Sequence, residues 1–286
     1  MLKSIHNKTV LSVLSAVIFL HASTAMALEA ADQPLHSTSS LNFLTQNDYA
    51  WIGSRIYQNE CAGQSKYLTH WGEGEEFPSF GIGHFIWFPK EVTPPYTETF
   101  PLLVQFVSKS HSPPVWLHRL DPFDAPWNSK KEFEQAWSEP ELNSLREWLS
   151  ETKTQQAEFI VSAFKARWKE ETARLSFEER QELESKLAVM MAFREGLFSV
   201  IDYFNFKGIG SNPKEQYQGE TWGLVSVLRQ LPSPQNMPGS NQARLELFVE
   251  SAKQRLLLRT QLAPKERNES RWLKGWYKRL DGYLLK

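Results

Sequence analysis

The chain has 286 residues, of which 32 are basic and 33 acidic, and its formal net charge is −1. This balance excludes the strongly basic surface that binds nucleic acid, so we expect no nucleic-acid partner. Cys61 is the single cysteine, which excludes an internal disulfide.

The first 27 residues have the pattern of a signal peptide. Lys3 and Lys8 give a basic start, residues 10–20 are apolar, and Ala25-Met26-Ala27 matches a small-residue cleavage site. The apolar run is short for a membrane-spanning helix, and an uncleaved anchor is the alternative. We expect a periplasmic or secreted protein that is cut after Ala27 and has no stable membrane insertion afterwards. A flexible lead-in over 28–40 should follow.

Residues 41–286 are predicted to form a single domain that begins with a helix. Apolar residues between Phe43 and Ile56 recur at near-helical spacing, which predicts a helix over 41–60 that ends at Glu60, before Gly63. Four glycines and a proline interrupt the next segment, between Lys66 and Trp87. Because short aromatic and β-branched pieces lie between them, we expect two or three short strands there.

Prolines recur from Pro89 to Pro126, which predicts a proline-rich insertion over about 89–128 that contains one helix near 100–108. From Ser129 the chain is predicted to be helical. Three Ser-x-x-Glu sequences match the capping box that starts helices. They begin at Ser129, Ser138 and Ser176.

The C-terminal half is predicted to be a series of helices. A long helix over 177–204 should have a buried centre, because its residues 187–203 are apolar on most sides. Glycines and a proline between 208 and 213 should interrupt it. We expect a restart near Thr221 and two last helices, over about 241–262 and 266–285. The predicted fold class is α+β, predominantly α, with a small β-hairpin lobe near the N-terminus of a helical body.

The acidic side chains around the predicted strands suit glycoside cleavage. A glutamate that packs against apolar surface can hold a proton and donate it to the leaving glycosidic oxygen. A second carboxylate, or a water held by a hydroxyl, acts on the other face of the sugar. Glu60 is the candidate acid. The candidates for the second role are Glu73, Glu75, Glu76 and Ser79, with Glu75 favoured among the acids because Gly74 frees the turn beside it.

This order of residues resembles the phage-type lysozymes and endolysins of the lysozyme-like superfamily. Those proteins place a catalytic glutamate at the end of the first long helix. An aspartate and a threonine follow on a small β-hairpin, and the threonine lies two residues before Gly-x-Gly-His. The resemblance implies that Glu60 is the general acid, that Ser79 takes the threonine position, and that Gly81-Ile82-Gly83-His84 holds it.

The chain also departs from this family. No aspartate stands in the hairpin, so Glu73 or Glu75 is the candidate replacement, and serine replaces threonine. The segment from Glu60 to His84 is a few residues longer. If no second carboxylate reaches the sugar, the resemblance implies the chemistry of lytic transglycosylases. In those enzymes one glutamate suffices, because the substrate's own hydroxyl attacks and an anhydro-sugar forms.

Two further stretches carry likenesses. Trp222-Gly223-Leu224 before a helix is similar to a Trp-x-Gly-Leu helix late in endolysins, which helps to close the far side of the cleft. The phrase from Gly81 to Pro89 is similar to one in a family of exported bacterial proteins of uncharacterised activity. The specific match covers about 25 residues around Glu60 to His84.

Other polar and aromatic residues are candidates for sugar contact. Tyr67 and Trp71 lie near the glycine turns and are the expected stacking residues, whereas Phe85 to Phe88 are expected in the core. His84 is also a candidate for substrate contact, and a structural role is expected for it rather than a catalytic one. The segment 205–224 is either an ordinary loop or the opposite wall of the cleft. Its candidate substrate-binding residues are Asn205, Asn212, Tyr217 and Trp222.

We therefore expect an exported enzyme that cleaves the glycan strands of peptidoglycan, as a muramidase or a lytic transglycosylase. The first alternative is a non-catalytic peptidoglycan-binding or scaffold protein on the same fold. The second is a cell-wall hydrolase that uses Cys61 with His70 or His84, although a helix C-terminus raises a thiol pKa. No cofactor is implied, and the spacing of His70, His84 and Glu60 matches no zinc site.

Overall fold

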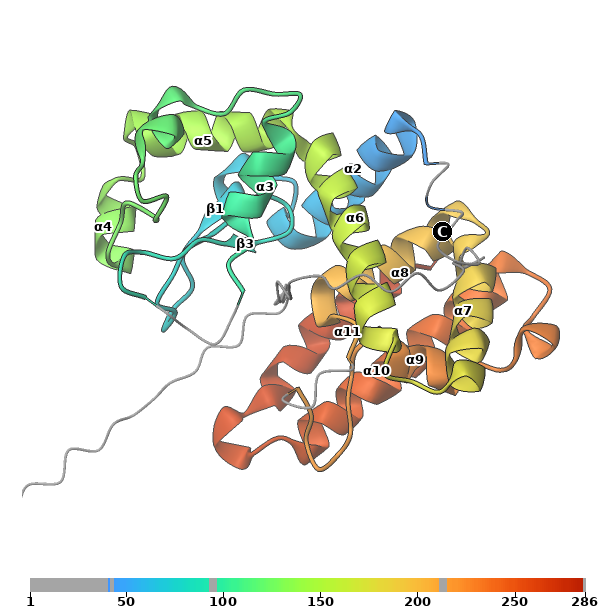
Figure 1. Ribbon diagram of the computed structural model, residues 1–286. Helices are drawn as coiled ribbons and strands as arrows, with labels where there is room; N and C mark the ends of the chain where they lie inside the picture. The colour runs from blue at the N-terminus through green and yellow to red at the C-terminus, as the bar shows by residue number, and fades with distance from the viewer. Residues whose placement is uncertain (1–40, 42–43, 93–96, 211–214, 285–286) are drawn as a thin grey trace, which may run out of the picture.

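The computed structural model describes residues 41, 44–92, 97–210 and 215–284 (Figure 1). The predicted signal peptide and lead-in, and the candidate residue Asn212, lie outside the described residues. In the described ranges, no helix combines the length and the apolar character needed to cross a membrane.

The described chain is predominantly helical with a small antiparallel sheet, which confirms the α+β class. The helices are α2 (Gln46–Cys61), α3 (Phe100–Val107), α4 (Lys130–Gln135), α5 (Pro140–Glu151), α6 (Lys153–Thr172), α7 (Phe177–Met191), α8 (Arg194–Lys207), α9 (Leu224–Gln230), α10 (Asn241–Leu262) and α11 (Leu273–Asp281). Short 3-10 turns are η2 (Ser65–Leu68), η3 (Val115–Arg119), η4 (Pro234–Asn236), η5 (Lys265–Arg267) and η6 (Glu269–Trp272).

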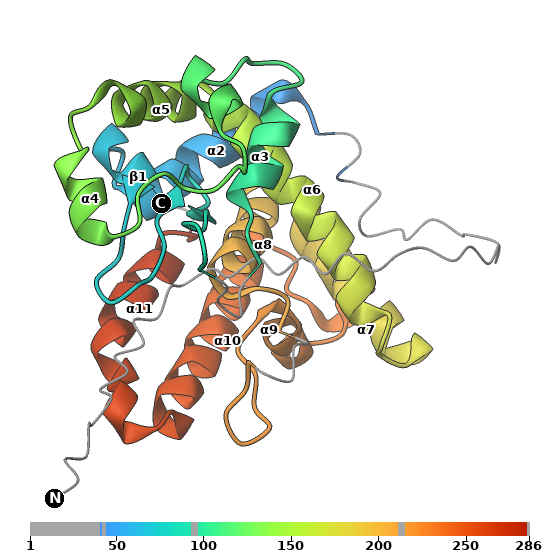
Figure 2. The same cartoon turned by 60° about the vertical axis from the view of Figure 1, so that its left-hand side comes forward.

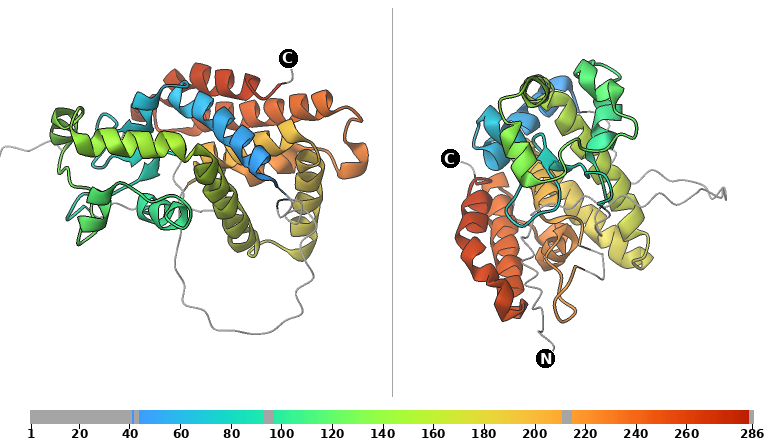
Figure 3. Two further views of the ribbon diagram at one scale, coloured as in Figure 1. Left: turned by 90° about the horizontal axis from the view of Figure 1, so that it is seen from above. Right: turned by 90° about the vertical axis from the view of Figure 1, so that its left-hand side faces the viewer.

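Three two-residue strands form the sheet, in the order β1 (Thr69–His70), β2 (Ser79–Phe80) and β3 (Phe85–Ile86). In the register, Ser79 lies opposite His70 on one side and Ile86 on the other. Figure 1 shows the sheet gathered with α3, α4 and α5 at one end of the molecule, which we call the small lobe. Helices α7 to α11 form the large lobe at the other end, and Figure 3 shows α6 running from one to the other.

Helix α2 begins at a capping box and ends at the candidate acid. Thr45 Oγ1 accepts from the N–H of Asp48 at 3.3 Å, and the Asp48 carboxylate accepts from the N–H of Thr45 at 2.9 Å. The helix ends at Cys61 and is followed by Ala62 and Gly63, both with positive φ, of 49° and 68°. Glu60 therefore lies in the last turn of a helix that is fixed at both ends.

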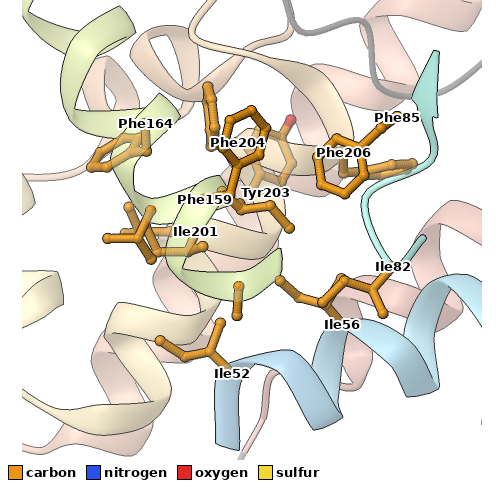
Figure 4. Packing of buried hydrophobic residues seen from close by; sticks show 14 of the residues in the cluster. Ile52, Ile56, Ile82, Phe85, Phe159, Phe164, Ile201, Tyr203, Phe204 and Phe206 are labelled. Carbon is orange, nitrogen blue, oxygen red and sulfur yellow. The ribbon is translucent and has the colours of Figure 1, made fainter. Parts of the chain in front are cut away.

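One hydrophobic core is shared by both lobes (Figure 4). Helix α2 contributes Ile52 and Ile56, the region of the sheet contributes Phe85, and α6 contributes Phe159, all of them buried. Helix α8 is buried along almost its whole length and supplies the other side of this cluster. Trp87 is fully buried, which confirms its expected place in the core.

Several predicted helices are confirmed. The helix near 100–108 is α3, and the helix over 241–262 is α10 with the predicted ends. Ser129 and Ser176 are N-caps, since their hydroxyls accept from the N–H groups of Glu132 and Glu179, both at 3.2 Å.

Three helix predictions are wrong in part. The helix over 177–204 is two helices, because the chain turns at Phe193 and Gly196 packs against the Met190 carbonyl, where a Cβ would lie 2.1 Å from that oxygen. Residues 187–203 are apolar on most sides because α7 and α8 pack on each other and α8 lies at the centre of the core. Ser138 is not a cap, because α5 starts at Pro140, whose fixed φ suits the first helical turn. The segment 266–285 holds 3-10 turns before α11.

Candidate functional site

The Glu60 carboxylate is largely shielded and contacts three elements. Its side chain is 11% exposed. Oε1 accepts a hydrogen bond from Asn205 Nδ2 at 3.2 Å and lies 2.7 Å from Arg279 Nη1. Oε2 lies 3.7 Å from His84 Nε2. The end of α2 thus meets α8, α11 and the turn of the sheet at one carboxylate.

His84 connects Glu60 to Ser79. It lies in the turn between β2 and β3, its φ of 48° is left-handed, and its side chain is 17% exposed. Its Nδ1 lies 3.3 Å from Ser79 Oγ, within hydrogen-bonding distance. His84 therefore has a structural contact to the strand and faces Glu60 with its other nitrogen.

A second carboxylate, Asp202 of α8, lies behind Arg279. The guanidinium donates twice to Asp202, at 2.8 and 2.9 Å, and the Tyr283 hydroxyl donates to Asp202 at 2.5 Å. Asn59 donates to the same carboxylate at 3.3 Å. Burial alone would lower the pKa of Arg279, but the Asp202 and Glu60 carboxylates outweigh it and hold that pKa well above its usual value. Arg279 is thus a permanent cation between two acids.

Two buried polar atoms beside this network have no hydrogen-bond partner among the described residues. They are Asn205 Oδ1 and Lys207 Nζ. The Lys207 ammonium position lies 3.9 Å from the centre of the Phe206 ring and 4.0 Å from that of Trp276. Burial, and then the nearby charge of Arg259, lower the pKa of Lys207 well below its usual value. Both effects therefore disfavour the charged form of Lys207.

The acidic candidates from the sequence have other partners. Glu73 is 92% exposed and pairs with Lys130 at 2.5 Å on the surface. The Glu75 carboxylate accepts a hydrogen bond from the N–H of Gly72 at 3.1 Å, within its own turn. Glu76 is exposed. The second carboxylate in the described network around Glu60 is Asp202, which is fully enclosed.

The aromatic candidates differ in exposure. Trp71 is 4% exposed, packs edge-on against Phe133 and donates to the Glu75 carbonyl, so its expected role as an open stacking surface is wrong. Its indole N–H finds a partner inside the lobe, which allows the ring to be buried. Tyr67 is 40% exposed and remains accessible.

Tyr217 and Trp222 belong to a different buried cluster. Their rings lie 4.9 Å apart, and Arg259 lies 4.3 Å from the Trp222 ring. The Tyr217 hydroxyl donates at 2.8 Å to Glu269, which also accepts from Arg259 at 2.6 Å. Among the residues of the expected opposite wall, Asn205 therefore lies next to Glu60. Tyr217 and Trp222 instead pack around the ion pair of Arg259 and Glu269.

Cys61 is an unsuitable nucleophile. Its thiol is fully buried at the end of α2 and donates to the Tyr67 carbonyl at 3.6 Å. Burial, together with the neighbouring Glu60 carboxylate, raises the pKa of Cys61 to about 12. This is the direction expected at a helix C-terminus, and it opposes formation of the reactive thiolate.

The order Ser79, His84 and Glu60 also resembles, by contact alone, a serine–histidine–acid relay. Ser79 is 1% exposed in the middle strand of the sheet, so its hydroxyl cannot reach a substrate carbonyl. The hydroxyl instead holds the ring of His84. The His70 ring lies edge-on to His84 at 6.2 Å, and burial lowers the pKa of His70. Across the described ranges, no three His, Cys, Asp or Glu side chains gather as a metal site.

The sequence prediction missed Arg279 and Asp202. Asp202 carried a signal, because it is the one acid in the apolar run from Leu197 to Phe206. An ionised group inside a buried helix requires a partner. The sequence around Arg279 gave no sign of a buried role, because α11 contains several basic residues.

Comparisons with known proteins found no matching family model, no matching curated protein and no matching solved structure.

Proposed function

We propose that this protein is an exported, lysozyme-like enzyme that cleaves the glycan strands of peptidoglycan with Glu60 as its general acid. The observation that supports the proposal is the placement of Glu60. It ends the first long helix, it is only 11% exposed, and it lies 3.7 Å from His84 of the hairpin. A shielded carboxylic acid beside a sheet turn is the arrangement needed to protonate a glycosidic oxygen.

The chemistry that fits best uses one carboxylate. Asp202 is enclosed by its four hydrogen bonds and cannot reach a sugar. Oε1 of Glu60 already contacts Asn205 and Arg279. Oε2 is therefore the oxygen that would carry the proton and donate it. After donation, the same carboxylate accepts the proton of the substrate's own attacking hydroxyl. We therefore favour a lytic transglycosylase, which forms an anhydro-sugar, over a muramidase.

A second candidate is a non-catalytic protein that binds peptidoglycan. The 2.7 Å contact between Arg279 and Glu60 favours it, because this ion pair gives the carboxylate a structural role between α2 and α11. In that case the same residues hold the lobes together and bind the glycan without cleaving it.

The two candidates are separated by incubating the protein with purified sacculi and analysing the soluble products by mass spectrometry. The enzyme should release muropeptides with anhydro ends, and Glu60→Gln should lower the rate by about 10²–10⁴-fold, the usual contribution of general acid catalysis. Glu73→Gln, at a 92% exposed side chain, is the control and should keep the wild-type rate.

Undiminished release by Glu60→Gln would reject the assignment of the acid. Binding of wild-type protein to sacculi without any product would favour the scaffold. Loss of activity in Cys61→Ala, with Glu60→Gln active, would favour the cysteine hydrolase instead. Circular dichroism of each variant shows whether the fold is retained.

A further inference from the structure

The turn that carries His84 is attached to helix α6 by one buried side chain, Gln156. Its amide oxygen accepts a hydrogen bond from the N–H of Ile82 at 2.9 Å. Its amide nitrogen donates to the Leu149 carbonyl at 2.6 Å and to Thr152 Oγ1 at 3.1 Å. Gln156 is fully buried, so rotation of this amide would leave buried polar groups unpaired at both ends.

The turn is shaped around this amide. Gly81 has a φ of 73°, and a Cβ there would lie 2.4 Å from Gln156 Oε1, so only glycine allows the approach. His84 itself has a left-handed φ of 48°. A non-glycine residue keeps such a conformation when its surroundings impose it. The bond from Gln156 to Ile82, two residues earlier, is part of that constraint.

The same turn of α6 also sets the position of the helix that carries Glu60. A Cβ on Gly53 of α2 would lie 2.7 Å from the carbonyl oxygen of Lys153, so the two helices approach closely there. Glu60 and His84 come from different elements and meet at 3.7 Å. Because the first turn of α6 contacts α2 directly and the His84 turn through Gln156, it controls the distance between them.

We propose that Gln156 is a positioning residue that fixes His84 against Glu60. It is fully buried, so it does this without touching a substrate. Its effect on the hairpin follows from the contacts alone. Only its effect on a reaction rate rests on the proposed function.

The test is Gln156→Met, which keeps the length of the side chain and removes all three hydrogen bonds. Exchange of the Ile82 amide should become about tenfold faster or more, the usual effect of losing one hydrogen bond. The ring ¹⁵N chemical shifts of His84 are assigned by their absence from the spectrum of His84→Gln. In Gln156→Met they should move towards those of the exposed His111. The kcat of muropeptide release should fall about 10–100-fold, with KM within twofold, because a small misplacement affects the reacting geometry more than binding.

Gln155→Met is the matched control, because Gln155 is the half-buried neighbour on the same helix and its Oε1 has no partner among the described residues. It should leave the His84 signals and the kcat unchanged. Gln156→Glu is the second variant. When protonated, the introduced carboxyl can accept from Ile82 and donate to Leu149, and when ionised it cannot donate. Its His84 signals should therefore match those of the wild type measured at the same pH when the pH is low, and differ from them when the pH is high.

Unchanged His84 signals in Gln156→Met would overturn the proposal, as would an equal loss of kcat in Gln155→Met. If Gln156→Met does not fold, His84 signals in Gln156→Glu that match those of the wild type at every pH overturn it. If the wild type releases no muropeptides, the proposed function fails, whereas the spectra of His84 and the exchange of Ile82 still decide the role of Gln156.

Discussion

At the scale of the residue, Lys207 is the charge that the fold does not accommodate. The neighbouring cations Arg279 and Arg259 are each paired with a buried carboxylate, Asp202 and Glu269 respectively. Lys207 has aromatic faces on both sides and no hydrogen-bond partner among the described residues. Burial without a hydrogen-bond partner disfavours the charged form, so folding favours the loss of its proton.

Replacing Lys207 with methionine should therefore stabilise the protein at neutral pH. The pKa of Lys207 is near 10.5 in the unfolded chain and well below that in the folded protein. Below pH 10.5 the unfolded wild type therefore binds one more proton than the folded wild type, and this destabilises the folded state. The stability gap between Lys207→Met and wild type should narrow by about 1.4 kcal/mol per pH unit as the pH rises from 8.5 to 9.5.

Urea denaturation at several pH values measures this gap. Lys186→Met is the control, because the Lys186 stem is equally buried but its ammonium pairs with Glu182 at 2.7 Å. A gap that stays constant with pH in Lys207→Met would mean that Lys207 remains charged in the folded protein.

At the scale of the element, the crossing of α2 and α6 sets the geometry of the site. Gly53 lies at this crossing, where a Cβ would be 2.7 Å from a backbone oxygen of α6. A Cβ added to Gly275 of α11 would lie in open space, with no neighbouring atom within 4 Å. Two helical glycines thus lie in opposite surroundings, one enclosed and one open.

Gly53→Ala should destabilise the protein by about 1–3 kcal/mol, because backbone cannot move aside for the added methyl group. Gly275→Ala should stabilise it by about 0.5–1 kcal/mol, since alanine has the higher helix propensity. Thermal or urea unfolding of the two variants compares them directly. Equal effects of the same sign would show that the α2–α6 crossing is more open than the contact at Gly53 implies.

Elements with strong local signals were predictable from the sequence. Helix α10 follows its N-cap Ser240 and runs to the predicted end, and Ser129 and Ser176 cap as expected. The turn at Phe193 was missed, because no proline marks it, the glycine that allows it, Gly196, lies inside α8, and the reversal depends on α7 packing against α8. The burial of Trp71 was missed for the same reason, since Phe133 lies 62 residues away in the chain.

At the scale of the whole molecule, the site joins the first and the last α-helix that the structure describes. Figure 2 shows α11, near the C-terminus, alongside the part of the molecule that holds α2. Arg279 links Glu60 of α2 to Asp202 of α8, and the Tyr283 hydroxyl donates a hydrogen bond to the Asp202 carboxylate. Glu60, Ser79 and His84 were predictable because one short segment holds them. Their distant partners were not, since only the packing of α8 and α11 brings them there.

Arg279→Met should therefore affect the whole fold. It leaves Asp202 and Glu60 buried without their cation, and removing one partner of a buried ion pair costs about 3–5 kcal/mol. Adding Asp202→Asn to the same chain removes one of the two uncompensated charges, so the double variant should be more stable than Arg279→Met alone. Urea unfolding of the wild type, both single variants and the double variant completes the cycle. Additive losses in the double variant would show that the two residues act independently, and the link among α2, α8 and α11 would then lie elsewhere.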